Sequence, residues 1–358
     1  MFFLKKKYYS YLYNFFLVLV FFFNEFSTNI VFSKNYNVDN IKVEEVYDLN
    51  FDKSKVIDKA FEKAFNILVN KLIEKKDRLK IKNISLKDKK NLIENFSIAD
   101  EKFISNYYIG NFNVQFNKRK IFNYLNKKSI IPSSPNQIEV FILPILIESN
   151  ENEPIYLNQN IFFNNWNFDI KNYHLIKYVL PNEDIEDYNI IKKNIKNIEN
   201  YDFKEITKKY NLQNEIILIM LKSKSQIRVF SKIIFGKKKL LLNNIYNIGD
   251  LNDEVKINNI ISDIKDNYED KWKSVNKVNI SIELPIRLSI NSKNTIFSEQ
   301  LEKNLSSIDL ISNFKIETFN NNEIIYKIIF NSTPNKFLEI MSLNSFKIDT
   351  SNEIWKIQ

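Results

Sequence analysis

Apolar and polar positions follow two periods along this chain, and the clearest helical pattern lies between residues 56 and 73. There the apolar residues come in adjacent pairs every four positions: Val56/Ile57, Ala60/Phe61, Ala64/Phe65, Leu68/Val69 and Leu72/Ile73. Four residues turn about 400° in an α-helix, so this stripe drifts by about 40° per pair. A drifting stripe is typical of a helix that lies across a twisted sheet. We therefore predict such a helix here, preceded by a strand over 41–47.

The rest of the chain up to residue 135 combines alternating and charged segments. Alternation over 103–116, interrupted by Gly110-Asn111, predicts one long strand with a bulge or two strands joined at a turn. The lysine-rich segment 75–90 is interpreted as a solvated helix pair or loop, and 121–125 begins a short helix. With a boundary in the proline-containing stretch 130–135, the sequence predicts an N-terminal α/β module over 34–133.

The middle of the chain predicts a second α/β module over 134–276. Its apolar runs predict strands at 140–147, 175–180, 216–221 and 227–235, with a hairpin turn at 236–239. Pro144 interrupts the first of these runs, which argues for an edge position or a bulge. Helices are expected at 161–166 and 205–210, and a longer one from Asp250 to about Lys273, because Asp250-x-x-Asp253 resembles a capping box.

The last segment, 277–358, has the order β-α-β-β-α-β. Strands are expected at 278–290, 310–319, 324–330, 346–349 and 354–357, with a helix at 295–305 and another that Thr333 caps. This order is that of a ferredoxin-like unit. The predicted fold class is therefore α+β, built of two or three small α/β modules.

The first 33 residues have the pattern of a signal peptide. Lys5-Lys6-Lys7 precedes an apolar run over 15–23, and polar residues and the small residue Ser33 follow. A membrane-spanning helix needs about 20 apolar residues, more than the segment 8–23 offers. We expect cleavage near Ser33 and a periplasmic protein, with anchoring in the inner membrane by residues 8–23 as the alternative.

Composition removes several kinds of chemistry. The 358 residues include no cysteine, one histidine (His174) and three widely spaced glycines, which excludes disulfides, thiol nucleophiles, cysteine-ligated clusters and glycine-rich phosphate loops. No Gly-x-Ser-x-Gly segment accompanies His174, so we expect no catalytic residues, metal ligands or cofactor. The net charge of +9 becomes +7 without residues 1–33, which favours an anionic envelope surface as partner, and export argues against nucleic acid.

Two groups of residues are candidates for binding. Trp166 lies among phenylalanines and would stack on sugar rings, although such aromatics more often belong to a core. Asp184 and Asp187 belong to an acidic run, 183–187, that would bind calcium or else stabilise the start of a helix capped by Asn182. The basic cluster 237–239 is interpreted as a solubilising turn.

Several of these stretches together resemble the proteobacterial exported proteins grouped as domain of unknown function 2066. They are the helix from Ala60 to Leu72, the strand 103–116 with the helix to Leu125, the strand 141–147, Trp166, and Leu180-Pro181 with Asp184 and Asp187. The resemblance covers residues 40–275 and implies a periplasmic or envelope protein, without catalytic residues to carry over. We therefore expect a non-catalytic interaction or assembly factor with an envelope partner. The alternative is a cell-wall or glycoside hydrolase that uses a carboxylate pair.

Overall fold

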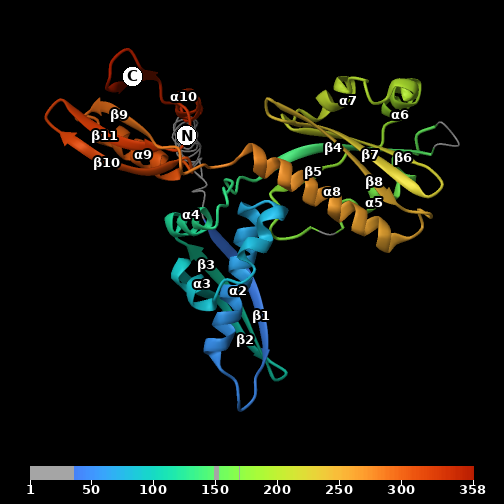
Figure 1. Ribbon diagram of the computed structural model, residues 1–358, viewed down its shortest axis with the longest axis horizontal. Helices are drawn as coiled ribbons and strands as arrows, with labels where there is room; N and C mark the ends of the chain where they lie inside the picture. Colours follow the sequence, from blue (N-terminus) through green and yellow to red (C-terminus); the bar gives the residue numbers. More distant parts are fainter. Residues whose placement is uncertain (1–35, 149–152, 169) are drawn as a thin grey trace, which may run out of the picture. The chain divides into compact units, whose positions relative to one another are not determined.

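The computed structural model describes residues 36–148, 153–168 and 170–358, and the expected signal peptide lies outside these ranges. The described chain is α+β, as predicted, with one sheet in each of the three segments expected to form modules (Figure 1). None of the helices in these ranges is long and apolar enough to cross a membrane.

The N-terminal sheet has the strand order β1-β3-β2 and is antiparallel throughout. Its strands are β1 (Asn37–Val46), β2 (Ile93–Ile104) and β3 (Tyr107–Phe116). The predicted long helix is α2 (Lys53–Leu72), which Asp52 caps and whose paired stripe is buried against the sheet. The charged segment forms the 3₁₀ helix η1 (Lys75–Ile81) and α3 (Leu86–Leu92), and α4 (Lys118–Lys127) follows the sheet.

The turn between β2 and β3 does not lie at Gly110-Asn111. The chain reverses at Ser105 and Asn106, whose φ angles of 48° and 64° are those of a tight hairpin turn. Gly110 lies inside β3, where a Cβ atom would come within 2.8 Å of the side chains of Phe112 and Tyr108. The glycine therefore provides room for two buried aromatic rings rather than a turn.

The middle sheet has the order β5-β4-β6-β7-β8. Its strands are β4 (Ile138–Glu148), β5 (Ile176–Val179), β6 (Glu215–Lys222), β7 (Gln226–Phe235) and β8 (Lys238–Asn247), of which the first three are parallel. One face packs on α5 (Ile161–Asn165) and α8 (Glu254–Val275), and the other packs on α6 (Ile185–Lys193) and α7 (Lys204–Thr207) (Figure 1). Short 3₁₀ helices lie at Leu157–Gln159 (η2), Ile195–Asn197 (η3) and Lys208–Tyr210 (η4).

Pro144 lies in β4, an interior strand without a bulge, so the edge position expected for the whole strand is wrong. The expectation holds locally. The register pairs β5 with β4 only as far as Phe141, and the Pro144 carbonyl, on the side of β5, accepts a hydrogen bond from Asn160 Nδ2 at 3.1 Å. The missing N–H of Pro144 therefore faces a stretch where β5 has already ended.

Helix α8 begins at Glu254, with Asp253 rather than Asp250 as its N-cap. It also carries a buried pair of charges, Glu269 and Lys273. Glu269 Oε1 accepts the backbone N–H groups of Leu175 and Ile176, both at 2.9 Å, and this carboxylate therefore holds the entry of β5 against the helix. Burial raises the pKa of Glu269 and lowers the pKa of Lys273.

The C-terminal segment has the predicted chain order β-α-β-β-α-β with a further short strand at its end, and its sheet has the strand order β10-β11-β9-β13-β12. Its strands are β9 (Leu284–Asn291), β10 (Ile311–Phe319), β11 (Glu323–Phe330), β12 (Ile348–Asp349) and β13 (Trp355–Ile357), with helices α9 (Thr295–Ser307) and α10 (Pro334–Leu343). Thr333 caps α10 as expected. The final hairpin places β13 parallel to β9, where a simple ferredoxin-like unit has an antiparallel strand.

Candidate functional site

A pocket of about 260 Å³ lies beside the N-terminus of α6, in the middle module. Its wall is formed by residues 143–145 of β4, the segment 154–158, and the segment from Pro181 into α6. Most of the lining side chains are apolar: Leu143, Pro144, Ile145, Pro154, Ile155, Leu157, Pro181, Ile185 and Ile191. Of the predicted binding residues, Asp184 and Asp187 line this pocket and Trp166 does not.

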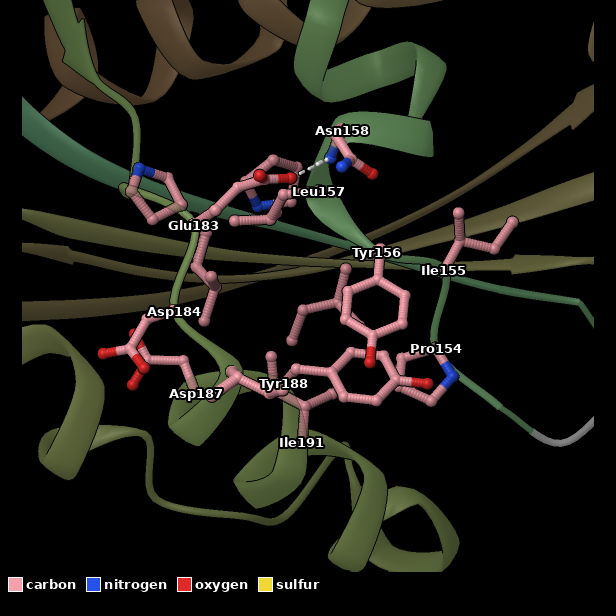
Figure 2. A pocket seen from close by; sticks show the side chains of 15 residues that line it. Pro154, Ile155, Tyr156, Leu157, Asn158, Glu183, Asp184, Asp187, Tyr188 and Ile191 are labelled. Atoms are coloured by element: carbon pink, nitrogen blue, oxygen red, sulfur yellow. Dashed lines mark hydrogen bonds between the residues drawn. The ribbon is translucent and has the colours of Figure 1, made fainter.

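Two tyrosines form one side of the pocket. The rings of Tyr156 and Tyr188 stack with their centroids 3.8 Å apart and their planes inclined by only 7° (Figure 2). Tyr156 is 43% exposed, and burial raises the pKa of Tyr188, so the phenol of Tyr188 is neutral near pH 7. This side offers flat aromatic surface with hydroxyl groups at its rim.

Acidic residues lie on the other side, away from the tyrosine rings (Figure 2). Lys209 Nζ lies 2.6 Å from Asp184 Oδ2 and 2.7 Å from Asp187 Oδ1, which joins η4 to the first turn of α6. The two carboxylates raise the pKa of Lys209, and the hydrogen bond from Lys209 lowers the pKa of Asp184. Both partners are therefore charged at neutral pH.

The helix-start interpretation of the acidic run agrees with the local geometry, with one correction. Asp184, not Asn182, is the N-cap of α6, because its Oδ1 accepts the N–H of Glu186 at 2.8 Å. Asn182 instead donates its N–H to the hydroxyl of Tyr210. Glu183 fixes the facing segment, since its Oε1 accepts the N–H of Asn158 at 2.7 Å.

Trp166 lies in the core between α5, β5 and α8 and is 0% exposed. Its ring contacts Tyr178 edge-on, with centroids 5.5 Å apart, and Lys265 Nζ lies 5.7 Å from the ring centroid. A sugar ring could stack on it only after the surrounding side chains had moved. Sugar binding at Trp166 stays a prediction.

The acidic residues near this pocket bear on the alternative of a hydrolase that uses a carboxylate pair. A general acid of a glycosidase needs a raised pKa, whereas the pKa of Asp184 is lowered. The carboxyl groups of Glu269 and Asp270, whose pKa values burial raises, lie on α8 and do not line the pocket. Within the described ranges, no three His, Cys, Asp or Glu side chains are grouped so as to hold a metal ion.

Sequence reasoning found the acidic part of this site and missed the rest. Tyr156, Tyr188 and Lys209 are separated by 32 and 21 positions, and no periodicity connects them. The one available signal was the set of prolines, Pro144, Pro154 and Pro181, each of which interrupts or borders an apolar run and lines the pocket.

The chain matches no protein-family model and no curated protein.

Proposed function

We propose that this chain is an exported envelope protein that acts without catalysis, as an interaction or assembly factor, and that the pocket beside α6 receives one side chain of a partner protein. The observation that carries the proposal is an apolar pocket with a stacked tyrosine side and an acidic side. The resemblance to the exported family of domain of unknown function 2066 and the signal-like segment 1–33 support the periplasmic location.

The size of the pocket favours an anchor residue over a whole small molecule. Pockets that enclose a cofactor or drug-sized ligand have volumes of about 300–1,000 Å³, and this one has about 260 Å³. Interfaces between proteins commonly place one aromatic or aliphatic side chain in a pocket of this kind. A leucine or tryptophan side chain would bury its apolar surface against Ile145, Ile155 and Ile191.

Charge favours a basic residue beside that anchor. Glu183, Asp184 and Asp187 line the pocket, and Lys209 provides the positive charge between the last two. The pocket therefore keeps an excess of negative charge, although the chain as a whole is basic. A lysine or arginine next to the anchor would meet Glu183 at the rim.

Short peptides test this proposal directly. Acetyl-Lys-Trp-Lys-amide should bind to the purified chain in calorimetry, and acetyl-Glu-Trp-Glu-amide and acetyl-Lys-Ser-Lys-amide should bind at least about tenfold more weakly, which corresponds to about 1.4 kcal/mol. The variant Leu157→Trp should abolish binding because the larger side chain fills the pocket. Leu343→Trp, the same change at an exposed position on α10, should leave binding unchanged.

Three results would contradict the proposal. Equal binding of all three peptides would contradict recognition of an anchor side chain with basic neighbours. Unchanged binding to Leu157→Trp would show that the peptide binds outside the pocket. Release of soluble fragments from purified peptidoglycan, lost on one Asp or Glu substitution, would establish the hydrolase instead. Export is tested separately by the N-terminal residue of the chain recovered from the periplasmic fraction, which should lie near residue 34.

A further inference from the structure

Strand β8 forms one edge of the middle sheet, and it differs from the other sheet edges of the described chain. Sheet edges are usually protected by charges, bulges or short length, because open N–H and C=O groups pair with other chains. β5 and β12 are only four and two residues long. β1, β2 and β10 have charged side chains and shifts of register against their neighbours.

β8 is long, and over most of its length it has neither charged side chains nor a shift of register. It pairs with β7 over ten residues without a shift of register, and residues 240–247, LLLNNIYN, include no charged side chain and no proline. The only charges of the strand are Lys238 and Lys239 at its start. Leu241 and Ile245 are 68% and 62% exposed on its outer face.

That outer face lies beyond the helices that cover the sheet. The segment that contains Glu199 and Tyr201 covers this face of the sheet only as far as β7. Arg228 NH2 donates to Glu199 at 3.2 Å, and Lys232 Nζ donates to the Tyr201 carbonyl at 2.9 Å. The neighbouring positions of β8, Ile245 and Leu241, are paired with these two residues in the register and remain exposed. An apolar stripe therefore continues along an open sheet edge.

The direction of the backbone groups decides which residues can pair. β7 and β8 are joined by a two-residue loop, so the flanking residues Phe235 and Lys238 form a hydrogen-bonded pair. Alternate residues from Lys238 onward then face β7. The N–H and C=O groups of Lys239, Leu241, Asn243, Ile245 and Asn247 face outward, and these are also the residues with exposed side chains.

This strand is complementary to itself in the antiparallel direction. With a two-fold axis at Asn243, Asn243 pairs with its own copy, Leu241 lies opposite Ile245, and Lys239 lies opposite Asn247. Every outward-facing residue then meets another, which gives about ten backbone hydrogen bonds. The lysines at residue 239 of the two copies lie about 27 Å apart, beyond the screening length at physiological salt.

We propose that β8 pairs with β8 of a second copy of this chain, antiparallel and centred on Asn243, to form a continuous ten-stranded sheet across a two-fold dimer. The partner is a second copy because the register satisfies the apolar, amide and lysine positions of both strands at once. The interface is small, so we expect a dissociation constant on the order of 10–100 μM.

Sedimentation velocity over a range of concentrations tests the dimer. The native chain should show a concentration-dependent monomer–dimer equilibrium. Asn243→Pro should remain monomeric, because proline at this outward-facing position removes an edge donor and no hydrogen bond to β7. Asn243→Ser, which loses the same amide side chain but keeps the N–H, should still dimerise, and so should Ile316→Lys on the edge strand β10. A native chain that stays monomeric to about 0.5 mM, well above the expected dissociation constant, or a dimer that persists in Asn243→Pro, would overturn the proposal.

Cross-linking tests the register even if Asn243→Pro fails to fold. The chain contains no cysteine, so a single introduced cysteine reports only on contact between copies. Asn243→Cys should be cross-linked to a dimer by a short bismaleimide, whereas Lys239→Cys should not. Equal cross-linking at both positions would indicate parallel in-register pairing, and no cross-linking at Asn243→Cys would contradict pairing centred on Asn243. Cross-linking at Lys239→Cys alone would indicate an antiparallel register shifted toward residue 239.

Discussion

The buried carboxylate of Glu269 provides the sharpest test of how the middle module is held together. Glu269→Ala removes the acceptor of two buried backbone N–H groups, those of Leu175 and Ile176, each 2.9 Å from Oε1. A hydrogen bond to a charged group contributes about 1.5–3 kcal/mol, and an unsatisfied buried donor costs a similar amount. We therefore expect a loss of about 3–5 kcal/mol in the free energy of unfolding, a large part of the stability of an ordinary domain.

Glu269→Gln separates the hydrogen bonds from the charge. The amide oxygen can still accept both N–H groups, so we expect a loss of about 1 kcal/mol. Urea denaturation followed by tryptophan fluorescence measures both variants, because Trp166 and Trp272 belong to the same core cluster. Equal destabilisation by the two substitutions, or a loss under about 1 kcal/mol for Glu269→Ala, would refute this account of the hydrogen bonds.

A comparison of the native chain with Glu269→Gln also gives a pH dependence of stability with a defined sign. Burial raises the pKa of Glu269, so the folded chain holds this proton more tightly than the unfolded chain. The stability that this tighter proton binding contributes is fully present below the ordinary pKa of 4.5 and is lost as the pH rises through the raised pKa. The native chain should therefore lose stability relative to Glu269→Gln as the pH rises from 4.5. A native chain that gains stability relative to Glu269→Gln over this pH range would contradict the burial argument.

Three further predictions concern single residues. Lys209→Met should lower the melting temperature by only about 2–4 °C near pH 7, because Lys209 is partly exposed and solvent screens the bonds to Asp184 and Asp187 that the substitution removes. Because the pKa of Lys209 is raised, this difference should begin to shrink above the ordinary value of 10.5 and be lost as the pH rises through the raised pKa, and a difference as large at pH 11 as at pH 7 would contradict it. Gly110→Ala should cost about 1–3 kcal/mol in urea denaturation, because its Cβ would meet two buried rings at 2.8 Å, and a neutral effect would show that the rings move freely. Trp166→Ala should cost about 3–5 kcal/mol and Trp166→Phe about 1 kcal/mol, as expected for a core ring whose Nε1 has no acceptor among the described residues; equal costs would contradict that interpretation.

The elements that sequence reasoning located are those whose burial, on one face or on both, leaves a pattern in the local sequence. The stripe of α2, the apolar run of β6 and the βαββαβ order of the last segment are local patterns that burial imposes on the sequence. β2 escaped notice because it is an edge strand, and most of its side chains are exposed. Its position depends on pairing with β3, which its own pattern of residues does not record.

The site was harder to predict than the fold for the same reason. Asp184 and Asp187 were visible because they lie three residues apart, but their partner Lys209 comes from η4 and meets them only when the sheet has formed. The stacked pair Tyr156 and Tyr188 likewise brings two separate segments together. Contacts between distant segments follow from topology, which a single sequence shows only indirectly.

The two prolines at the end of β5 have a consequence for the pocket. Pro144 on β4 and Pro181 just after β5 both lack the N–H that would extend the ladder between these strands, and both line the hollow beside α6. The proline rings therefore lie where the ladder between β4 and β5 would otherwise continue and close the pocket. Residues with a backbone N–H at both positions would let β4 pair with the segment that follows β5. That pairing would reduce the space in which a partner's side chain binds.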